Sequence, residues 1–472
     1  MTDPLVERMR PFGTTIFAEM SALAARTGAV NLGQGFPDTD GPAEMLEAAR
    51  AAILGGHNQY PPGPGVPALR AAIAEHQRRF WGLEYDPDGE VLVTAGATEA
   101  IAASILGLCE AGDEVICFEP YYDSYAASIA LAGAVRRPVT LRPTTTTTAG
   151  PAAKATATST GTGNTGTAAI AGHPTFTTAA GTTGHPTGDS APGPTGHPAA
   201  DSGPTGHPTD ASGPGVEDTF LGAAGPEGDP GAGYAFDPDE LRAAFSPRTR
   251  LVLLNSPHNP TGKVFTRAEL TLISELCVEH DVIAVCDEVY EHLVFDGEHL
   301  PLAGFPGMRD RTLQISSAGK TFSCTGWKVG WVCGPAPLVS AVLRVKQFLT
   351  FVNAGPFQPA VAVALALPDG YYRGFRDELR AKRDALSEGL RKAGFDVRRA
   401  EGTYFVTADI TPLGGVDGVE FCRALPERSG VVAVPTQVFY DDVEAGRRLV
   451  RFAFCKKPEV LAEAVSRLTV GA

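Results

Sequence analysis

Short apolar runs rich in β-branched residues alternate with amphipathic stretches along most of the chain. We expect strands at residues 90–96, 113–120, 249–257 and 281–288 and in "RTLQISSAGK", with helical patterns such as "ATEAIAASILGL" and "TRAELTLISELCVEH" between them. This alternation predicts an α/β fold with a mostly parallel, doubly wound-like sheet. Ligands bind at the carboxyl ends of the strands in such sheets, so the residues just past each run are the candidates for function.

One stretch, residues 143–230, departs from this pattern. It consists mainly of Thr, Gly, Ala, Pro and Ser, and repeats "GHPT" or "GHPA". Because it has few large apolar side chains, it can bury too little apolar surface to offset the conformational entropy lost on folding. We therefore expect an inserted, disordered linker. The repeats contain four regularly spaced histidines, but nothing nearby fixes a metal geometry, and we expect no metal: His173, His185, His197 and His207. The rest divides into an N-terminal arm with part of a small domain (1–42), a large cofactor domain (43–340) and a small α+β domain completed by 341–472.

Composition narrows the class of protein. The 472 residues are 43% hydrophobic and 20% charged, with a net charge of −15, which argues against nucleic acid or an anionic membrane as partner. The longest apolar run, "AVAVALAL", is far shorter than a membrane span, and the N-terminal segment has charges where a signal peptide is apolar. The eight cysteines have no paired or metal-type spacing. We therefore expect a cytoplasmic protein with reduced thiols.

The residues that follow the predicted strands include groups that match the separate parts of one ligand: a phosphate, a flat ring, a ring nitrogen and an aldehyde. Free N–H groups where a helix opens, at "GATEA", suit a phosphate, and the tyrosines of "EPYYDSY", Tyr121 and Tyr122, suit a flat ring. Asp287, at the end of a buried strand, suits a protonated ring nitrogen. Lys320 suits an aldehyde, with which it would form a Schiff base. Singly each signal is weak, but in this order they describe pyridoxal phosphate.

The motifs resemble those of fold-type I, class I aminotransferases. The matching blocks are "NLGQGFPD", "NQYPPGPG", "NSPHNPTG", "DEVYEHL", "SSAGKTFSCTGWKVGW" and "LVRFAF", in the family's order. Within that class, the chain is most similar to the branch of N-succinyldiaminopimelate, kynurenine, glutamine and methionine aminotransferases. The resemblance implies a pyridoxal 5'-phosphate enzyme that moves an amino group from an amino acid to a 2-oxo acid.

The resemblance also implies roles for individual residues. Lys320 would carry the cofactor and shuttle the proton, Asp287 would keep the ring nitrogen protonated, and Tyr122 would stack on the ring. The ring oxygen would be bound by Tyr290 and Asn259, and the phosphate by Gly96, Ala97, Thr98, Ser317 and Lys328. The substrate carboxylate would be clamped by Arg451, helped by Gly35 and Asn259. Tyr60 would reach the phosphate of a neighbouring subunit, which implies a homodimer with shared sites.

The choice of substrate is open at this stage. The side-chain pocket has candidates in Phe439, Tyr440 and the stretch Phe351, Val352 and Asn353. No second arginine can be assigned to a distal carboxylate. N-succinyl-LL-2,6-diaminopimelate is the favoured donor by resemblance, with kynurenine, glutamine, methionine or β-elimination from a cysteine conjugate as alternatives. A binding protein on the same scaffold would be expected to have lost the lysine, aspartate or arginine, and all three are present.

Overall fold

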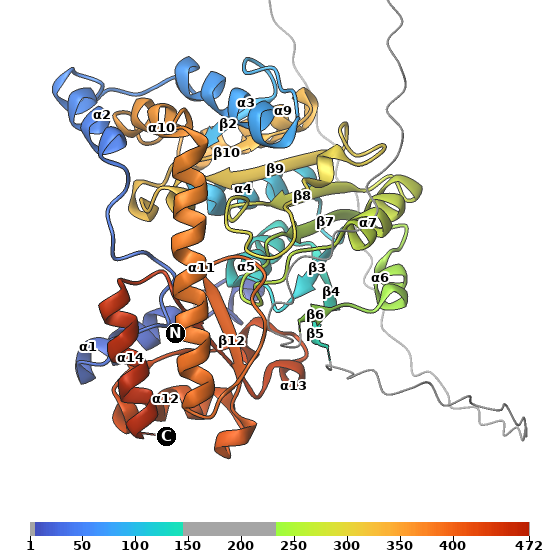
Figure 1. The fold of residues 1–472 in the computed structure, drawn as a ribbon. Helices are drawn as coiled ribbons and strands as arrows, with labels where there is room; N and C mark the ends of the chain where they lie inside the picture. Colours follow the sequence, from blue (N-terminus) through green and yellow to red (C-terminus); the bar gives the residue numbers. More distant parts are fainter. Residues whose placement is uncertain (1–4, 145–232, 472) are drawn as a thin grey trace, which may run out of the picture. The chain divides into compact units, whose positions relative to one another are not determined.

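A seven-stranded sheet organises the larger part of the computed structural model, which describes residues 5–144 and 233–471 (Figure 1). In sheet order its strands are β2 (Val91–Thr94), β10 (Gly330–Cys333), β9 (Thr312–Ser317), β8 (Ile283–Asp287), β7 (Thr249–Asn255), β3 (Glu114–Glu119) and β4 (Val135–Thr140). Strand β10 runs antiparallel to both its neighbours, and the other pairings are parallel. The predicted mostly parallel α/β sheet is confirmed. The antiparallel strand was not predicted.

Both faces of this sheet are covered because successive side chains along a strand point to opposite sides. In β3, Val115 and Cys117 pack into one core cluster, while Ile116 and Phe118 pack into another. The first cluster draws on helices α4 (Gly96–Leu108), α5 (Asp123–Ala132) and α9 (Ala336–Leu349). The second includes residues of α6 (Pro238–Ala244) and α7 (Arg267–Glu279). A third core cluster, beside β2 and β10, includes residues of α2 (Ala43–Leu54), α3 (Pro67–Trp81) and α10 (Phe357–Leu365).

The register of the central strands brings three chain segments to one edge of the sheet. Asn255, the last residue of β7, pairs with Asp287, the last residue of β8. Strand β9 runs parallel to β8 and leads into the short helix α8 (Ala318–Thr321), which carries Lys320. Because parallel strands end at the same edge, residues separated by more than sixty positions meet there.

A smaller antiparallel sheet is built mainly from the C-terminal part of the chain. Its strands are β11 (Asp396–Val397), β12 (Phe405–Asp409), β15 (Leu449–Ala453) and β14 (Val434–Pro435), and a separate parallel pair joins β1 (Val30–Asn31) to β13 (Val431–Val432). The helices around it are α1 (Ile16–Thr27), α11 (Asp369–Lys392), α12 (Gly418–Ser429), α13 (Val443–Gly446) and α14 (Pro458–Gly471). The division into domains at residues 42 and 340 stays a prediction.

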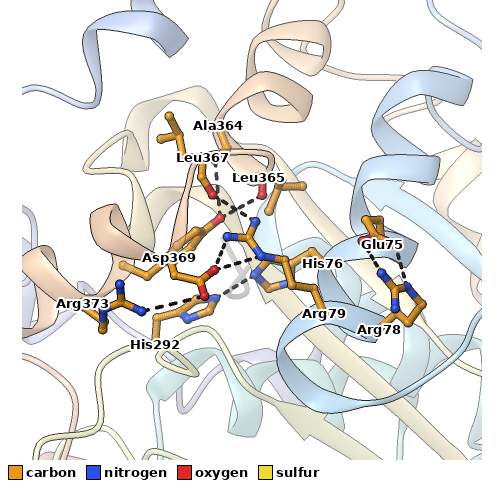
Figure 2. Close-up of polar contacts among 11 residues, drawn as sticks. Glu75, His76, Arg78, Arg79, His292, Ala364, Leu365, Leu367, Asp369 and Arg373 are labelled. Atoms are coloured by element: carbon orange, nitrogen blue, oxygen red, sulfur yellow. Dashed lines mark hydrogen bonds and ion pairs between the residues drawn. The ribbon is translucent and has the colours of Figure 1, made fainter.

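Helix α11 contributes side chains to the hydrophobic cores beside both sheets. Its Tyr372 belongs to the core beside α3 and α10, whereas Leu386 and Leu390 belong to the core of the small sheet. At its start, Asp369 accepts a 3.0 Å hydrogen bond from Nε of Arg79 in α3, and Arg79 also donates to the Leu367 carbonyl at 3.0 Å (Figure 2).

Figure 2 also shows an imidazole pair next to this contact, in which His76 is buried and His292 is partly exposed. The Nε2 atoms of His76 and His292 lie 2.7 Å apart. Burial lowers the pKa of His76 to about 3 and that of His292 well below its usual value, so both rings are neutral and one donates to the other. The pair joins α3 to the segment after β8 without adding a buried charge.

The cysteines and the helix lengths bear on two predictions made from composition. All eight cysteines are free, as predicted, and all are buried. Among the described residues, no helix has both the length and the apolar character needed to cross a membrane. The predicted linker and its four histidines lie outside the described residues, apart from the first two positions.

The chain enters and leaves the low-complexity stretch through a pair of strands. Strand β5 (Arg142–Pro143) pairs antiparallel with β6 (Tyr234–Ala235), and the Thr144 N–H donates to the Gly233 carbonyl at 2.8 Å. Thr144 and Gly233 are therefore positioned like the two residues that flank a hairpin turn.

This geometry predicts that the intervening segment is dispensable. A variant in which residues 145–232 are replaced by Asn-Gly should fold with a melting temperature no lower than that of the full chain, because a two-residue turn fits an antiparallel pair and a shorter loop costs less closure entropy. Thermal melts of both proteins test this. A melting temperature of the shortened variant clearly below that of the full chain would contradict it.

Candidate active site

A cavity of about 920 Å³ opens at the sheet edge where Asn255, Asp287 and Lys320 meet. It is lined by every residue to which the resemblance gives a role except Tyr60: Gly35, Gly96, Ala97, Thr98, Tyr122, Asn259, Asp287, Tyr290, Ser317, Lys320, Lys328 and Arg451. Tyr60 is 81% exposed, and its ring packs on Phe351 at 5.5 Å. The convergence of these residues identifies the candidate active site.

Lys320 is held in the cavity as an amine of reduced basicity. Within the described residues its Nζ has no hydrogen-bond or ion-pair partner, and it lies 5.9 Å and 5.7 Å from the ring centres of Tyr290 and Tyr404. Burial lowers the pKa of Lys320 to about 8, and the charges of Lys328 and Arg451 act in the same direction. A lysine near this pKa has a substantial neutral fraction at physiological pH, which is the form that acts as nucleophile or base.

Asp287 is a buried carboxylate aimed into the same space. Tyr125 donates its hydroxyl to Oδ2 of Asp287, and the side chain of Asn255 donates to the Asp287 carbonyl at 2.8 Å. Burial raises the pKa of Asp287 to about 6, while the hydrogen bond from Tyr125 opposes this rise. The carboxylate is thus ready to accept a cationic partner, which would favour its charged form.

The start of α4 and Lys328 form a cradle for an anion. Gly96 has φ +77°, a left-handed conformation that suits glycine, and it opens the first turn, in which the N–H groups have no intrahelical acceptor. A Cβ placed on Gly96 would lie 3.5 Å from the Lys328 side chain, so this cation runs beside the helix start. N-terminal N–H groups with an adjacent ammonium are suited to a phosphate.

Arg451 is a buried cation with no acidic partner in the described part of the chain. One terminal nitrogen, Nη1, donates to Oδ1 of Asn259 at 3.0 Å, and the other, Nη2, donates to the Gly33 carbonyl at 2.8 Å, while Nε has no acceptor. The guanidinium also lies 4.0 Å from the ring centre of Phe405. Burial lowers the pKa of Arg451 to about 10, so the group stays charged at neutral pH. A carboxylate from outside the chain would offset the cost of burying this charge and would accept the unused N–H.

These residues fit pyridoxal phosphate. The cofactor needs an amine, an anion cradle, an acid opposite its ring nitrogen and an aromatic face. The cavity supplies them through Lys320, the α4 cradle with Lys328, Asp287 and Tyr122. The unused Nε of Arg451 marks a further anion position for the substrate.

The structure also corrects part of the predicted side-chain pocket. Phe439 lines the cavity, but Tyr440, Phe351, Val352 and Asn353 do not. Tyr440 is buried, and its hydroxyl is directed to the Leu141 carbonyl, whereas Asn353 donates to the carbonyls of Thr94 and Lys328. Tyr121, the other ring candidate, is not among the lining residues and donates its hydroxyl to Asp441 at 2.6 Å.

Several lining residues were not singled out from the sequence. Tyr125 and Asn255 lie within the motifs "EPYYDSY" and "NSPHNPTG". Asn255 is also the last residue of a strand, and the expectation that functional residues lie at strand ends could have identified it. Phe17 and Glu19 come from α1, and Arg423 comes from α12. Only the packing of these terminal helices brings those three to the cavity, and no local pattern indicates it.

Comparisons with known proteins identify the family. The family model for aminotransferase class I and II matches residues 27–162 and 229–468. The solved structure of N-succinyldiaminopimelate aminotransferase from Mycobacterium tuberculosis is 46% identical, with a TM-score of 0.80, and the match covers 99% of this chain and 100% of that one. Methionine aminotransferase from Escherichia coli is 34% identical (99% and 98% covered), and kynurenine–oxoglutarate transaminase 3 from Mus musculus is 33% identical (96% and 87% covered).

The chain therefore belongs to the class I and II aminotransferases. It is a fold-type I enzyme that depends on pyridoxal phosphate and transfers amino groups.

The burial of Asp287 predicts a stability effect in the cofactor-free protein. Its pKa is about 6 in the folded chain, above the ordinary aspartate value of 3.8, so folding favours the protonated form. That stability is fully present below about pH 4 and is lost as the pH rises through 6. Asp287→Asn should therefore raise the free energy of unfolding of the apoprotein at pH 7.5 by about 1–3 kcal/mol and much less at pH 4.

Urea titrations of the two apoproteins at both pH values provide the measurement. Equal stabilities at pH 7.5, or a gain of the same size at pH 4, would contradict a buried, strained carboxylate. The same variant should lose most of its turnover as the holoenzyme.

Proposed function

We propose that this aminotransferase takes its amino group from N-succinyl-LL-2,6-diaminopimelate and passes it to 2-oxoglutarate in a ping-pong cycle. The observation that carries this choice is the 46% identity to N-succinyldiaminopimelate aminotransferase over essentially the whole of both chains. The relatives named for methionine and kynurenine are 34% identical or less. The cavity, at about 920 Å³, is large enough for the cofactor together with a long side chain.

We propose Lys320 and Asp287 as the groups that carry the proton chemistry. When bound, pyridoxal phosphate supplies an electron-withdrawing ring that stabilises negative charge at the substrate's Cα. The Lys320 amine takes the proton from Cα, a role supported by its burial and its pKa of about 8. The Asp287 carboxylate holds a proton on the ring nitrogen, and Tyr125 orients that carboxylate through its hydroxyl.

Arg451 is proposed to bind the α-carboxylate of the substrate. Its two hydrogen bonds, to Asn259 and to the Gly33 carbonyl, fix the plane of the guanidinium. A fixed fork presents two parallel N–H groups to a carboxylate and so orients Cα toward Lys320. The remaining cofactor roles follow the sequence prediction: Tyr122 for the ring face, Tyr290 and Asn259 for the ring oxygen, and Gly96, Ala97, Thr98, Ser317 and Lys328 for the phosphate.

We also propose a homodimer in which Tyr60 completes the phosphate site of the partner. Tyr60 is 81% exposed in the single chain and packs on Phe351, which is 55% exposed, and Phe348, three residues earlier in the chain than Phe351, is 84% exposed. Large apolar side chains gathered on a surface are typical of an interface. With its reduced, buried cysteines the protein is expected in the cytoplasm.

Replacing Lys320 tests the assignment of the catalytic amine. Lys320→Ala should lower kcat by at least about 10³-fold and abolish the covalent attachment of the cofactor that borohydride makes permanent, because among the described residues Lys328, at the anion cradle, is the only other amine lining the cavity. Lys328→Ala is the matched comparison, and it should weaken cofactor binding while leaving covalent attachment possible at saturating cofactor. Near-normal turnover by Lys320→Ala would contradict the assignment.

An amino-donor panel tests the substrate. With 2-oxoglutarate as acceptor, N-succinyl-LL-2,6-diaminopimelate should show a kcat/KM at least about 10-fold above methionine, kynurenine and glutamine, the scale of discrimination expected for additional contacts in one pocket. Incubation of a cysteine conjugate without an acceptor measures β-elimination. Preference for methionine or kynurenine, or pyruvate release that needs no acceptor, would point to those activities instead.

A further inference from the structure

A fourth cation lines the cavity besides the three already assigned. The lining cations in the described part of the chain are Lys320, Lys328, Arg451 and Arg423. The first three face cofactor and α-carboxylate. Arg423 belongs to α12, lies at the rim with its side chain 56% exposed, and has no role in the chemistry described so far.

Arg423 is paired with an acid that lines the same cavity. Its Nε donates to Oε1 of Glu19 in α1 at 2.7 Å, and its Nη2 donates to Oε2 at 3.3 Å. Both side chains are substantially exposed, at 56% and 40%. An ion pair in such contact with water is worth little, so another carboxylate can replace Glu19 at low cost.

Apolar walls lie near Arg451 and continue along the helices that carry the rim pair. The rings of Phe17 and Phe439 stack at 5.6 Å, and Arg451 lies 5.0 Å and 5.8 Å from their centres. Phe17 is two residues before Glu19 on α1, and Val419 lines the cavity one helical turn before Arg423 on α12. The cavity thus combines a deep guanidinium, apolar walls and a guanidinium at the rim.

From this arrangement we infer that Arg423 is a specificity-determining residue that binds a distal carboxylate of an acidic amino donor. Glu19 competes with that carboxylate for the Arg423 guanidinium. The inference rests on the proposed donor, which has two distal carboxylates, one on the carbon that bears the succinylamide and one at the end of the succinyl group. When such a donor enters, its carboxylate takes the place of Glu19. When a neutral donor enters, Glu19 keeps the guanidinium neutralised.

Opposite variants of the pair separate recognition from a structural role. Arg423→Gln removes the receptor, and the ratio of kcat/KM for N-succinyl-LL-2,6-diaminopimelate to that for methionine should fall about 10- to 100-fold, mostly through KM, since a contact made equally in the ground and transition states changes binding. Glu19→Gln removes the competitor, and the same ratio should rise about 3- to 10-fold. A pair that only holds α1 to α12 is broken in both variants and would move the ratio in the same direction.

Arg78→Gln serves as the control. Arg78 forms a similar exposed pair with Glu75 on α3, with exposures of 58% and 56%, and neither residue lines the cavity. This variant should leave the ratio unchanged. Melting temperatures of all three variants check that each is folded.

A second acidic donor, L-2-aminoadipate, distinguishes failure of this inference from failure of the proposed donor. If wild type ignores N-succinyl-LL-2,6-diaminopimelate but uses L-2-aminoadipate, with ratios to methionine that move in opposite directions in the two variants, the inference stands and the proposed donor is wrong. Unchanged ratios in both variants, or shifts in one direction, overturn the inference and leave the donor assignment to the panel. No turnover of any acidic donor by wild type overturns both.

Discussion

Three charged side chains surround one cavity, and they do not neutralise one another completely. Among the residues that the structure describes, Lys320 and Arg451 have no acidic hydrogen-bond partner, and Asp287 is held by neutral donors. Burial makes each charge costly, which is why the pKa values of all three shift toward the neutral form. Such an arrangement persists in a folded protein because cofactor and substrate supply the missing partners.

The scaffold positions these charges through ordinary strand and helix geometry. Parallel register puts Asn255 beside Asp287, and the turn after β9 adds Lys320 from a third segment. Arg451 arrives from the middle strand of the smaller sheet, where it pairs with Thr407 and Val434. Helix α11 contributes to the cores of both sheets, so the site depends on the packing of the two parts against each other.

The sequence predicted what depends on local pattern. Apolar runs indicated the parallel strands, and the polar residues that follow them, such as Asp287 and Lys320, proved to converge because the carboxyl ends of parallel strands meet. It did not predict strand β10, whose antiparallel direction depends on pairing with β2 and β9. Nor did it predict Glu19 and Arg423, which are brought together from α1 and α12, or the exclusion of Tyr440 from the cavity. These features are set by tertiary packing, which leaves no periodic trace along the chain.

The central claim is that the buried amine at position 320 carries the cofactor. The most direct measurement is mass spectrometry of peptides from holoenzyme that has been reduced with borohydride and digested. The account predicts a phosphopyridoxyl group on the peptide that contains Lys320, with Lys328 unmodified. A cofactor-loaded protein with Lys320 unmodified, or with the group on another lysine, would contradict it.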